Sequence, residues 1–388
     1  MHPLSIGIVG TGPAALMAGT ALAESGQQVH FFDQSKAPAR KFLVAGHGGF
    51  NLTHSENIEE FISKYDRDTM RSCVSHFTNC DFIDFLKKIG IETYVGSSGK
   101  IFPVRGVKPI EVLNAWLDHL KRLGAQFDLE HRLVDFDASS ITLDYKGALK
   151  EYTFDRIIFA LGGGSWSRTG SDGKWTALFR AKGIPVMDLA ASNSGFELAG
   201  VEKLESYAGQ SIKNCKAFSD SIEKYGDVVL TDYGIEGAPI YALNREYRND
   251  KKIYLDLKPT LLSDEIENKL AKGVNVTEAL KAMKLSKGAV GILKAWLSKE
   301  EFLDRSALAP RIKKLELPIS GIRPLDEVIS SVGGISSEAI GPNFELVKYP
   351  GIFCVGEMVD WDAPTGGYLI QGCVSSGMKA ARSIIDQS

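Results

Sequence analysis

The chain has 388 residues, of which 44% are hydrophobic and 24% are charged, and its net charge is −3. This composition is typical of a soluble globular protein with two or three domains. No segment is a continuous basic run and no apolar run reaches membrane-spanning length, so we expect no nucleic-acid partner and no membrane span. The five cysteines are odd in number and form no CxxC pair, which favours a reducing cytoplasm over a disulfide scaffold.

The first elements along the chain are a strand, a glycine-containing turn, a helix and a second strand. Residues 4–9 (LSIGIV) have the composition of a buried strand, and the apolar pattern after GTGP predicts a helix that ends near Gly26. Pro13 suits the first turn of that helix, and Gly26 suits the position just after its end. Residues 28–33 (QVHFFD) are the second strand. A unit of this kind implies a parallel sheet.

The next part of the chain is predicted to hold helices and then an antiparallel excursion. Residues 57–90 and 108–123 have helical spacing, and residues 96–106 between them read as a loop or a hairpin. Short strands within residues 125–160 suggest a three-stranded antiparallel excursion, after which the chain re-enters the main sheet at RIIFAL.

Residues 191–319 carry no nucleotide motif and are expected to form an inserted domain. Its first part, about residues 191–260, mixes short strands with turns. Residues 261–316 are instead rich in Lys and Glu at helical spacing. We therefore expect a small β part followed by a helical part.

After this insert the chain returns to features like those at its start. Residues 332–388 contain a glycine-rich patch, a strand in YPGIFCVGE and a C-terminal helix from about Gln371. The flanking segments, residues 1–190 and 320–388, are therefore expected to fold together as one Rossmann-like domain.

The GTGPAA sequence at residues 10–15 is typical of dinucleotide binding. Gly10 allows a tight turn, Gly12 lets the backbone approach a pyrophosphate, and Ala15 is a small residue at the third glycine position of the fingerprint. The N-terminus of the following helix offers N–H groups and a positive dipole end to the phosphates. Asp33 ends the second strand, where an acid holds a ribose hydroxyl. A plain turn is the competing interpretation, but strand, turn, helix, strand and acid follow in the required order.

Two further segments favour FAD over NAD. The ALGG sequence at residues 160–163 is similar to the ATG signature of FAD proteins. PGIFCVGE at residues 350–357 has the strand-glycine-acid pattern whose carboxylate binds the ribityl chain. A long cofactor must be contacted from several distant segments. The sequence has no CxxC, P-loop or Ser/His/Asp order, which indicates that the flavin carries the redox chemistry.

Five segments are spread over almost the whole length of the chain: GTGPAALMAG, ARKFLVAGHGGFNLTH, GKIFPV, FALGGGSW and VGEMVDWDAPTGGYLIQGCVSSG. In combination they resemble the BaiN/YhiN-like flavoproteins, also described as NAD(P)/FAD-dependent oxidoreductases or aminoacetone-oxidase-family proteins. The resemblance implies an α/β fold with a Rossmann-like FAD-binding domain of glutathione-reductase type. It also implies an insert with a β-barrel-like part and a helical part.

The resemblance further implies cofactor contacts, position by position. A basic pair lies near the ribose and pyrophosphate, an NLT loop lies beside the cofactor, a strand residue meets adenine through its backbone, and a GGY turn passes the isoalloxazine. With the motifs above, the predicted FAD contacts are Gly10, Gly12, Pro13, Ala14, Ala15, Asp33, Gln34, Arg40, Lys41, Gly46, Asn51, Thr53, Leu133, Ala160, Gly162, Gly356, Glu357, Gly366, Gly367 and Tyr368.

Two positions depart from the family pattern. Ala39 stands where the family often has glycine, and Phe50 stands where many members have cysteine, so we expect no thiol beside the flavin. The family also implies that the N-terminus of the C-terminal helix faces the flavin, where its dipole would stabilise the charge of the reduced ring. An ordinary packed terminal helix is the alternative.

Three side chains are candidates for substrate contact. His47 lies in the glycine loop, Tyr233 lies in TDYGIEG, which matches a THYG-like loop of the family, and Trp361 lies in the flavin segment. Packing is the competing interpretation for Tyr233 and Trp361. His47 and His54 have no Cys or acid cluster near them in sequence, so no metal site is expected.

We therefore predict a FAD-dependent oxidoreductase that transfers a hydride through flavin N5 on an unidentified small organic substrate. NAD(P)H is a candidate electron donor. Because only one nucleotide fingerprint is present, it would reach the flavin transiently at the insert interface. Two alternatives stay open: an oxidase of a small amine or alcohol, and a non-catalytic flavin-binding protein with a redox-sensing or RNA-linked role. No oligomeric state is predicted.

Overall fold

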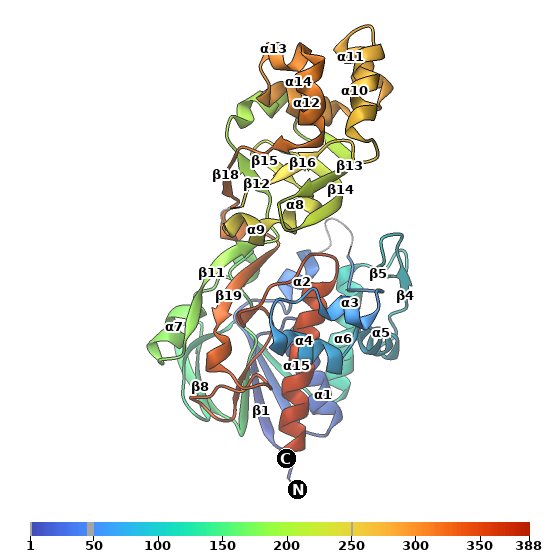
Figure 1. Cartoon of the computed structure of the whole chain (residues 1–388). Helices are drawn as coiled ribbons and strands as arrows, with labels where there is room; N and C mark the ends of the chain where they lie inside the picture. Colours follow the sequence, from blue (N-terminus) through green and yellow to red (C-terminus); the bar gives the residue numbers. More distant parts are fainter. Residues whose placement is uncertain (1, 45–49, 250) are drawn as a thin grey trace. The chain divides into compact units, whose positions relative to one another are not determined.

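The structure, a computed structural model, describes residues 2–44, 50–249 and 251–388. The chain divides into two compact units (Figure 1): unit 1 comprises residues 1–190 and 329–388, and unit 2 comprises residues 191–328. The second boundary lies later than the expected 319/320. The reason is that β18 (Ile319–Ile322) pairs with β12 (Phe196–Leu198) and therefore belongs to unit 2.

The centre of unit 1 is a five-stranded parallel sheet in the order β20-β10-β1-β2-β6. Strands β20, β10 and β1 are almost wholly buried, whereas β2 is about half buried and the edge strand β6 is only partly buried. The parallel sheet confirms the predicted α/β, Rossmann-like class. The strands are β1 (Ser5–Val9), β2 (Gln28–Asp33), β6 (Gln126–Leu129), β10 (Arg156–Phe159) and β20 (Ile352–Cys354).

Two helices of unit 1 lie side by side, α1 (Pro13–Glu24) and α15 (Tyr368–Asp386) (Figure 1). A Cβ atom on Gly377 would lie 2.1 Å from the carbonyl oxygen of Ala14, so only glycine permits this approach. The small residues of α15 thus allow close packing on α1. The helix begins at Tyr368, earlier than the predicted Gln371, because the positive φ of Gly367 (108°) ends the preceding turn directly before it.

The remaining elements of unit 1 surround this layer. The predicted hairpin is present as β4 and β5, which β3 extends, whereas β6 joins the parallel sheet and leaves β7, β8 and β9 as the antiparallel excursion. The helices are α2 (Arg40–Val44), α3 (Ile58–Ile62), α4 (Asp68–His76), α5 (Asn79–Lys88), α6 (Pro109–Arg122) and α7 (Trp175–Ala181), and the 3-10 turns are η1 (Ser167–Thr169), η4 (Ser337–Ala339) and η5 (Gly356–Met358). The strands are β3 (Thr53–His54), β4 (Thr93–Val95), β5 (Lys100–Pro103), β7 (His131–Phe136), β8 (Ser140–Tyr145), β9 (Ala148–Thr153), β11 (Val186–Ser192) and β19 (Ser330–Ile335).

Unit 2 is built on a seven-stranded sheet in the order β17-β16-β13-β14-β15-β12-β18. Its two end strands, β17 (Leu315–Glu316) and β18, are separated along the chain by only Leu317 and Pro318. Two residues reach too short a distance to span a flat sheet of this width. The sheet must therefore curl until its edges approach each other, which is a barrel-like arrangement.

A helical lobe completes unit 2, and the unit has a hydrophobic core of its own. The other strands of the sheet are β13 (Ser211–Phe218), β14 (Glu223–Leu230), β15 (Gly234–Glu236) and β16 (Tyr254–Asp256). Short helices near the sheet are α8 (Ala238–Tyr241) and α9 (Asn244–Arg248), with 3-10 turns η2 (Val201–Tyr207) and η3 (Leu325–Glu327). The lobe itself is α10 (Ser263–Lys272), α11 (Val276–Ala282), α12 (Lys287–Trp296), α13 (Lys299–Leu303) and α14 (Arg305–Lys313).

Candidate functional site

The turn between β1 and α1 contains two glycines that differ in what surrounds them. Gly10 has φ 109°, and a Cβ atom there would lie 2.2 Å from the carbonyl oxygen of Ala160. Gly12 has an ordinary extended backbone, and a Cβ atom there would meet nothing within 4 Å. No side chain caps α1, and its first turn has no acidic residue. The helix N-terminus is therefore open to an anionic ligand.

Asp33, the predicted ribose acid, is held in place by the same turn. One carboxylate oxygen accepts a hydrogen bond from the Thr11 hydroxyl, and the other accepts one from the backbone N–H of Ser35 at 2.8 Å. The Thr11 hydroxyl also accepts from the N–H of Ala39 at 2.9 Å. Ala39 has φ 50°, which explains in physical terms why glycine would suit this position.

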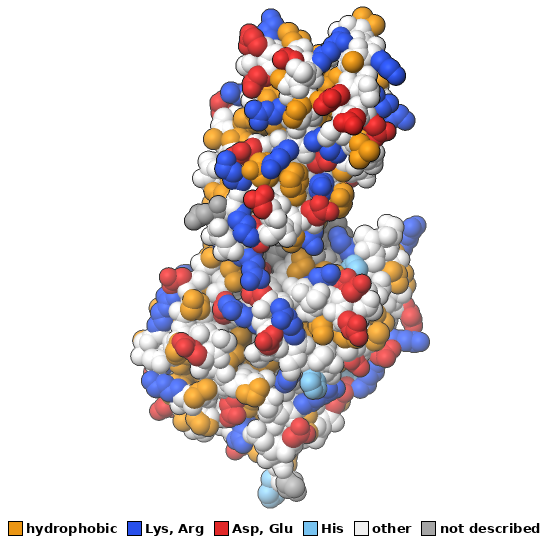
Figure 2. Space-filling model, in the orientation of Figure 1, with side chains coloured by type: hydrophobic (Ala, Val, Ile, Leu, Met, Phe, Trp, Pro, Cys, Tyr) orange, Lys and Arg blue, Asp and Glu red, His pale blue; other side chains and the backbone are white. Residues whose placement is uncertain are grey.

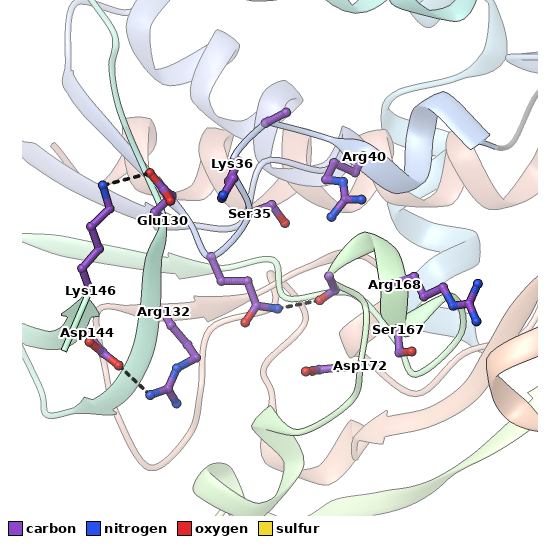
Figure 3. Close-up of a pocket in the computed structure, with 13 residues that line it drawn as sticks. Ser35, Lys36, Arg40, Glu130, Arg132, Asp144, Lys146, Ser167, Arg168 and Asp172 are labelled. Atoms are coloured by element: carbon purple, nitrogen blue, oxygen red, sulfur yellow. Dashed lines mark hydrogen bonds and ion pairs between the residues drawn. The ribbon is translucent and has the colours of Figure 1, made fainter.

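A pocket of about 750 Å³ is lined by residues that directly follow Asp33 in the sequence, among them Ser35 and Lys36 (Figure 3). Three segments form it: the loop after β2, the β7–β8 hairpin and the glycine-rich segment after β10. Gln34 bridges two of these segments, because its amide donates to the carbonyl oxygen of Gly170 at 2.7 Å. The lining residues are Gln34, Ser35, Lys36, Ala37, Arg40, Glu130, Arg132, Asp144, Lys146, Ser167, Arg168, Gly170 and Asp172.

The pocket carries an excess of unpaired positive charge. Figure 3 shows Lys146 beside Glu130 and Arg132 beside Asp144, and the paired atoms are 3.5 Å and 2.8 Å apart. Three further cations, Lys36, Arg40 and Arg168, form no ion pair with any other residue that the structure describes. An anionic ligand with adenosine-sized bulk matches this chemistry. Leu133 itself does not line the pocket, although its strand does.

Three cofactor segments meet at Lys41. Its ammonium nitrogen lies 2.7 Å from the hydroxyl of Ser165 and 2.7 Å from a carboxylate oxygen of Glu357. These residues come from α2, from the segment after β10 and from the turn after β20, so the fold brings together motifs that lie far apart in sequence. The pair is partly buried, with side-chain exposures of 25% for Lys41 and 14% for Glu357.

The NLT and GGY segments also touch each other. A Cβ atom on Gly367 would lie 2.5 Å from the backbone of Thr53, so the two chains pass in direct contact. The Thr53 hydroxyl donates to the side chain of Gln371 at 2.8 Å and is buried. Asn51 makes no side-chain hydrogen bond to another described residue, so its amide is available to a ligand.

Tyr368 is held by packing. Its hydroxyl donates to a carboxylate oxygen of Glu56 at 2.6 Å, and its ring stacks on His54 and contacts Phe61. Burial, followed by the hydrogen bond to Glu56, raises the pKa of Tyr368. This hydroxyl therefore stays protonated at physiological pH.

Trp361 is part of the core. It is 3% exposed, and its indole N–H donates to the carbonyl oxygen of Gly356 at 2.9 Å. The packing interpretation therefore describes this residue better than substrate contact. The preceding Asp360 is also buried and pairs with Arg67, so it is not a solvated loop residue.

The other single-residue hypotheses have different outcomes. Phe50 packs edge-to-face on Phe42 of α2, with ring centroids 4.9 Å apart. Tyr233 lies in unit 2, where its hydroxyl donates to Glu236 at 2.8 Å and the guanidinium of Arg323 lies 4.3 Å from its ring centroid. Gly46 and His47 lie outside the described residues.

The part of the chain that the structure describes contains neither a candidate metal site nor a candidate membrane-spanning helix. No group of His, Cys, Asp and Glu side chains there could hold a metal ion. None of the helices in those ranges combines the length and apolar character needed to cross a bilayer.

The residues present fit FAD. The uncapped N-terminus of α1 and the open space at Gly12 suit a pyrophosphate, Asp33 and the cationic pocket suit the adenosine end, and Glu357 suits a ribityl hydroxyl.

Comparison with known proteins identifies the family. Residues 4–383 match the HI0933-like protein Rossmann domain. The chain belongs to this family. By family and fold it has a Rossmann domain interrupted by an insert.

Family relatives align along nearly the full chain. A ribosomal RNA dihydrouridine synthase of Escherichia coli (strain K12) is 22% identical over 97% of each chain. A 3-dehydro-bile acid delta(4,6)-reductase of Clostridium scindens is 23% identical over 98% of this chain and 99% of that protein. Among solved structures, a 3-ketosteroid-delta4-(5alpha)-dehydrogenase from Rhodococcus jostii RHA1 is similar with a TM-score of 0.53 at 13% identity, covering 99% of this chain and 97% of that one. The similarity to this solved structure supports the assignment of the fold.

Sequence reasoning missed four polar side chains near the site. They are Lys36, Ser165, Arg168 and Arg132. The segment GGGSWSRTGSDG drew attention only through its glycines, and its Arg168 was the available signal because a basic residue in a glycine-rich loop often faces an anion.

Proposed function

We propose that the protein is a FAD-dependent reductase that adds two hydrogens across a carbon–carbon double bond conjugated with a carbonyl group. The meeting of three predicted cofactor segments at Lys41, Ser165 and Glu357, in a chain of this family, supports the FAD site, and the names of two relatives support the substrate class. The narrower BaiN/YhiN-like assignment is part of the same proposal.

The names of the two curated relatives suggest the substrate class. Dihydrouridine is uridine with its ring C5–C6 bond saturated, and that bond is conjugated with a ring carbonyl in uridine. A delta(4,6)-reductase of a 3-dehydro compound likewise acts on double bonds conjugated with a ketone. In both cases the carbon that accepts hydride is electron-poor because the carbonyl draws electrons from it.

When bound, FAD supplies hydride chemistry at its N5 atom. The chain's own residues would hold it in position: the N-terminus of α1 at the pyrophosphate, Asp33 at the ribose and Glu357 at the ribityl chain. The Lys41 ammonium donates to the Glu357 carboxylate and so orients it. The contact of Thr53 with Gly367 would place the N-terminus of α15 near the ring, where its dipole favours negative charge.

Anaerobic spectroscopy tests the proposal. Protein loaded with FAD is mixed with NADH or NADPH, and loss of the oxidised flavin absorbance is expected with at least one of them. The reduced protein is then mixed with a Δ4-3-ketosteroid or with unmodified rRNA transcripts, and mass spectrometry is expected to find a product with two added hydrogens.

Three outcomes would contradict the proposal. Protein that stays colourless after incubation with FAD would exclude the cofactor. Reduction of the flavin by a small amine or alcohol, with oxygen as the acceptor, would favour the oxidase alternative. No reduction by any of these donors would favour a binding protein without turnover.

A further inference from the structure

The helical lobe of unit 2 contains a stretch with only one sign of charge. Between Glu278 and Glu300 the chain has five lysines and no acidic residue, although its net charge is −3. All five side chains are exposed, and none forms an ion pair with another described residue. They are Lys281, Lys284, Lys287, Lys294 and Lys299.

Lys281, Lys284 and Lys287 lie in or beside the turn between α11 and α12, and the backbone of this turn is held by hydrogen bonds. The N–H of Lys284 donates to the carbonyl oxygen of Lys281 at 2.9 Å, and the N–H of Leu285 donates to that of Leu280 at 3.1 Å. This pair of bonds is the Schellman pattern that ends a helix. Met283 is buried and anchors the turn. The cationic side chains are therefore presented from a defined backbone.

Two of the lysines occupy positions that local stability does not favour. Lys284 has φ 57°, a conformation in which glycine or asparagine is preferred. Lys287 is the first residue of α12, where the helix dipole disfavours a cation. By contrast, α10, α11 and α13 all have acidic residues in their first turns. Residues that oppose local preferences are typical of functional surfaces.

One face of α12 extends the cationic surface. Lys294 lies seven residues after Lys287 and so shares its side of the helix. Another side of α12 packs against the rest of unit 2. Gly288 lies close to β13, and Gly291 lies close to the ring of Tyr207. Figure 2 shows Lys and Arg side chains along the edge of unit 2 where α10 and α11 lie, with Asp and Glu beside them.

We propose that Lys281, Lys284, Lys287 and Lys294, which we call the lysine surface, bind the phosphate backbone of RNA. The inference rests on the proposed function, because it assigns that function a uridine-containing RNA substrate. Charge complementarity supports it, since these exposed lysines form no ion pair with a described residue and follow one another without an intervening acid. The ammonium nitrogen of Lys294 also lies 5.4 Å from the ring centroid of Phe302. A small conjugated ketone would need no such surface. The sequence predicted no nucleic-acid partner because the net charge is −3 and no continuous basic run is present.

The test measures binding of the FAD-loaded full chain to unmodified transcripts of small- and large-subunit rRNA over a series of salt concentrations. The variant replaces Lys281, Lys284 and Lys287 with Gln. A matched control replaces Lys203, Lys213 and Lys224 with Gln, since these lysines are also exposed, lack ion pairs among the described residues and belong to unit 2. Both variants change the charge equally, and their melting curves are compared with the wild type.

We expect the lysine-surface variant to lose at least about tenfold in affinity and about 2 from the slope of log K against log salt. The control is expected to bind like the wild type. Reduction of the flavin and of a small conjugated ketone is expected to be unchanged in both variants.

Three results would overturn the inference. The first is absence of RNA binding by the wild type, which would leave reduction of a small ketone untouched and so separate this inference from the proposed function. The second is an equal loss in the two variants. The third is equally tight, lysine-dependent binding of poly-glutamate, which would indicate an acidic protein partner instead.

Discussion

The pocket of unit 1 and the sheet of unit 2 differ in whether their polar side chains have partners within the protein. In unit 2, Arg323 pairs with Glu197, Lys313 pairs with Asp256, and the Tyr233 hydroxyl donates to Glu236. In unit 1, Lys36 and Arg40 line a pocket and form no ion pair with a described residue. Cations that line a pocket without a protein partner indicate where a ligand would bind in unit 1, whereas the paired groups around the sheet of unit 2 indicate a self-contained structure from which the exposed lysines of its helical lobe stand apart.

Substitution of the two turn glycines should separate folding from ligand binding most strongly. Gly10→Val is expected to destabilise the protein by about 4 kcal/mol or more, because a Cβ atom would clash with Ala160 at a positive φ. Gly12→Val should fold normally but lose FAD, because its side chain would fill the open space above the turn. Thermal melts and flavin absorbance measure the two effects. A yellow Gly12→Val protein would contradict the assignment.

Added FAD should stabilise unit 1 selectively. At a concentration of one hundred times Kd, a ligand that binds only the folded state contributes about 2.7 kcal/mol. Hydrogen exchange should therefore slow in β1, β2 and β10 more than in β13 and β14. Equal protection of both sets of strands would show that the units do not differ in this way.

Two carboxylates offer a smaller test of the same contrast. Glu357→Ala should weaken FAD binding by about 1.5–3 kcal/mol, because it removes a charged hydrogen-bond acceptor and leaves Lys41 without its partner. Glu236→Ala removes a similar acid from unit 2 and should leave the FAD affinity unchanged. Fluorescence titration of the flavin measures both, and equal losses would contradict the placement of the site.

The smallest expected effect is a pH dependence confined to unit 1, since unit 2 contains no histidine. Burial lowers the pKa of His30, and Asp128 offsets this in part. The unfolded chain, with a histidine pKa of about 6.5, then binds more protons than the folded one, so stability falls as pH decreases below that value. Urea unfolding of the wild type and His30→Gln from about pH 5 to about pH 8 should show a flatter profile for the variant. Identical profiles would exclude His30 as the cause.

The sequence predicted unit 1 better than unit 2 for a physical reason. A dinucleotide constrains the residues around it, so the Gly10 turn, Asp33 and the Gly356-Glu357 turn carry a recognisable spacing. The partner of Lys41 at Ser165 could not be predicted, because side-chain contacts between distant segments leave no periodic signal. For the same reason the sequence left Trp361 ambiguous between packing and substrate contact. In the folded chain this side chain is buried and donates a hydrogen bond to Gly356.

The residues alone predicted unit 2 only as a β part followed by a helical part, and its barrel-like form was implied by the family resemblance. Its sheet order depends on pairing between strands far apart in sequence, such as β12 with β18. Hydrophobic alternation defines a strand but not its neighbour. The boundary was therefore placed at residue 319, inside the region that completes the sheet.

The pairing of β11 with β19 has an evolutionary consequence. The chain leaves unit 1 through β11 and returns through β19, and a Cβ atom on Gly333 would lie 2.2 Å from the carbonyl oxygen of Asp188, so the outgoing and incoming segments run in direct contact. An inserted unit whose two ends are adjacent can be lengthened, replaced or lost without disturbing the order of the parent sheet. Recombination at these two paired strands would join the same Rossmann unit to different inserted units.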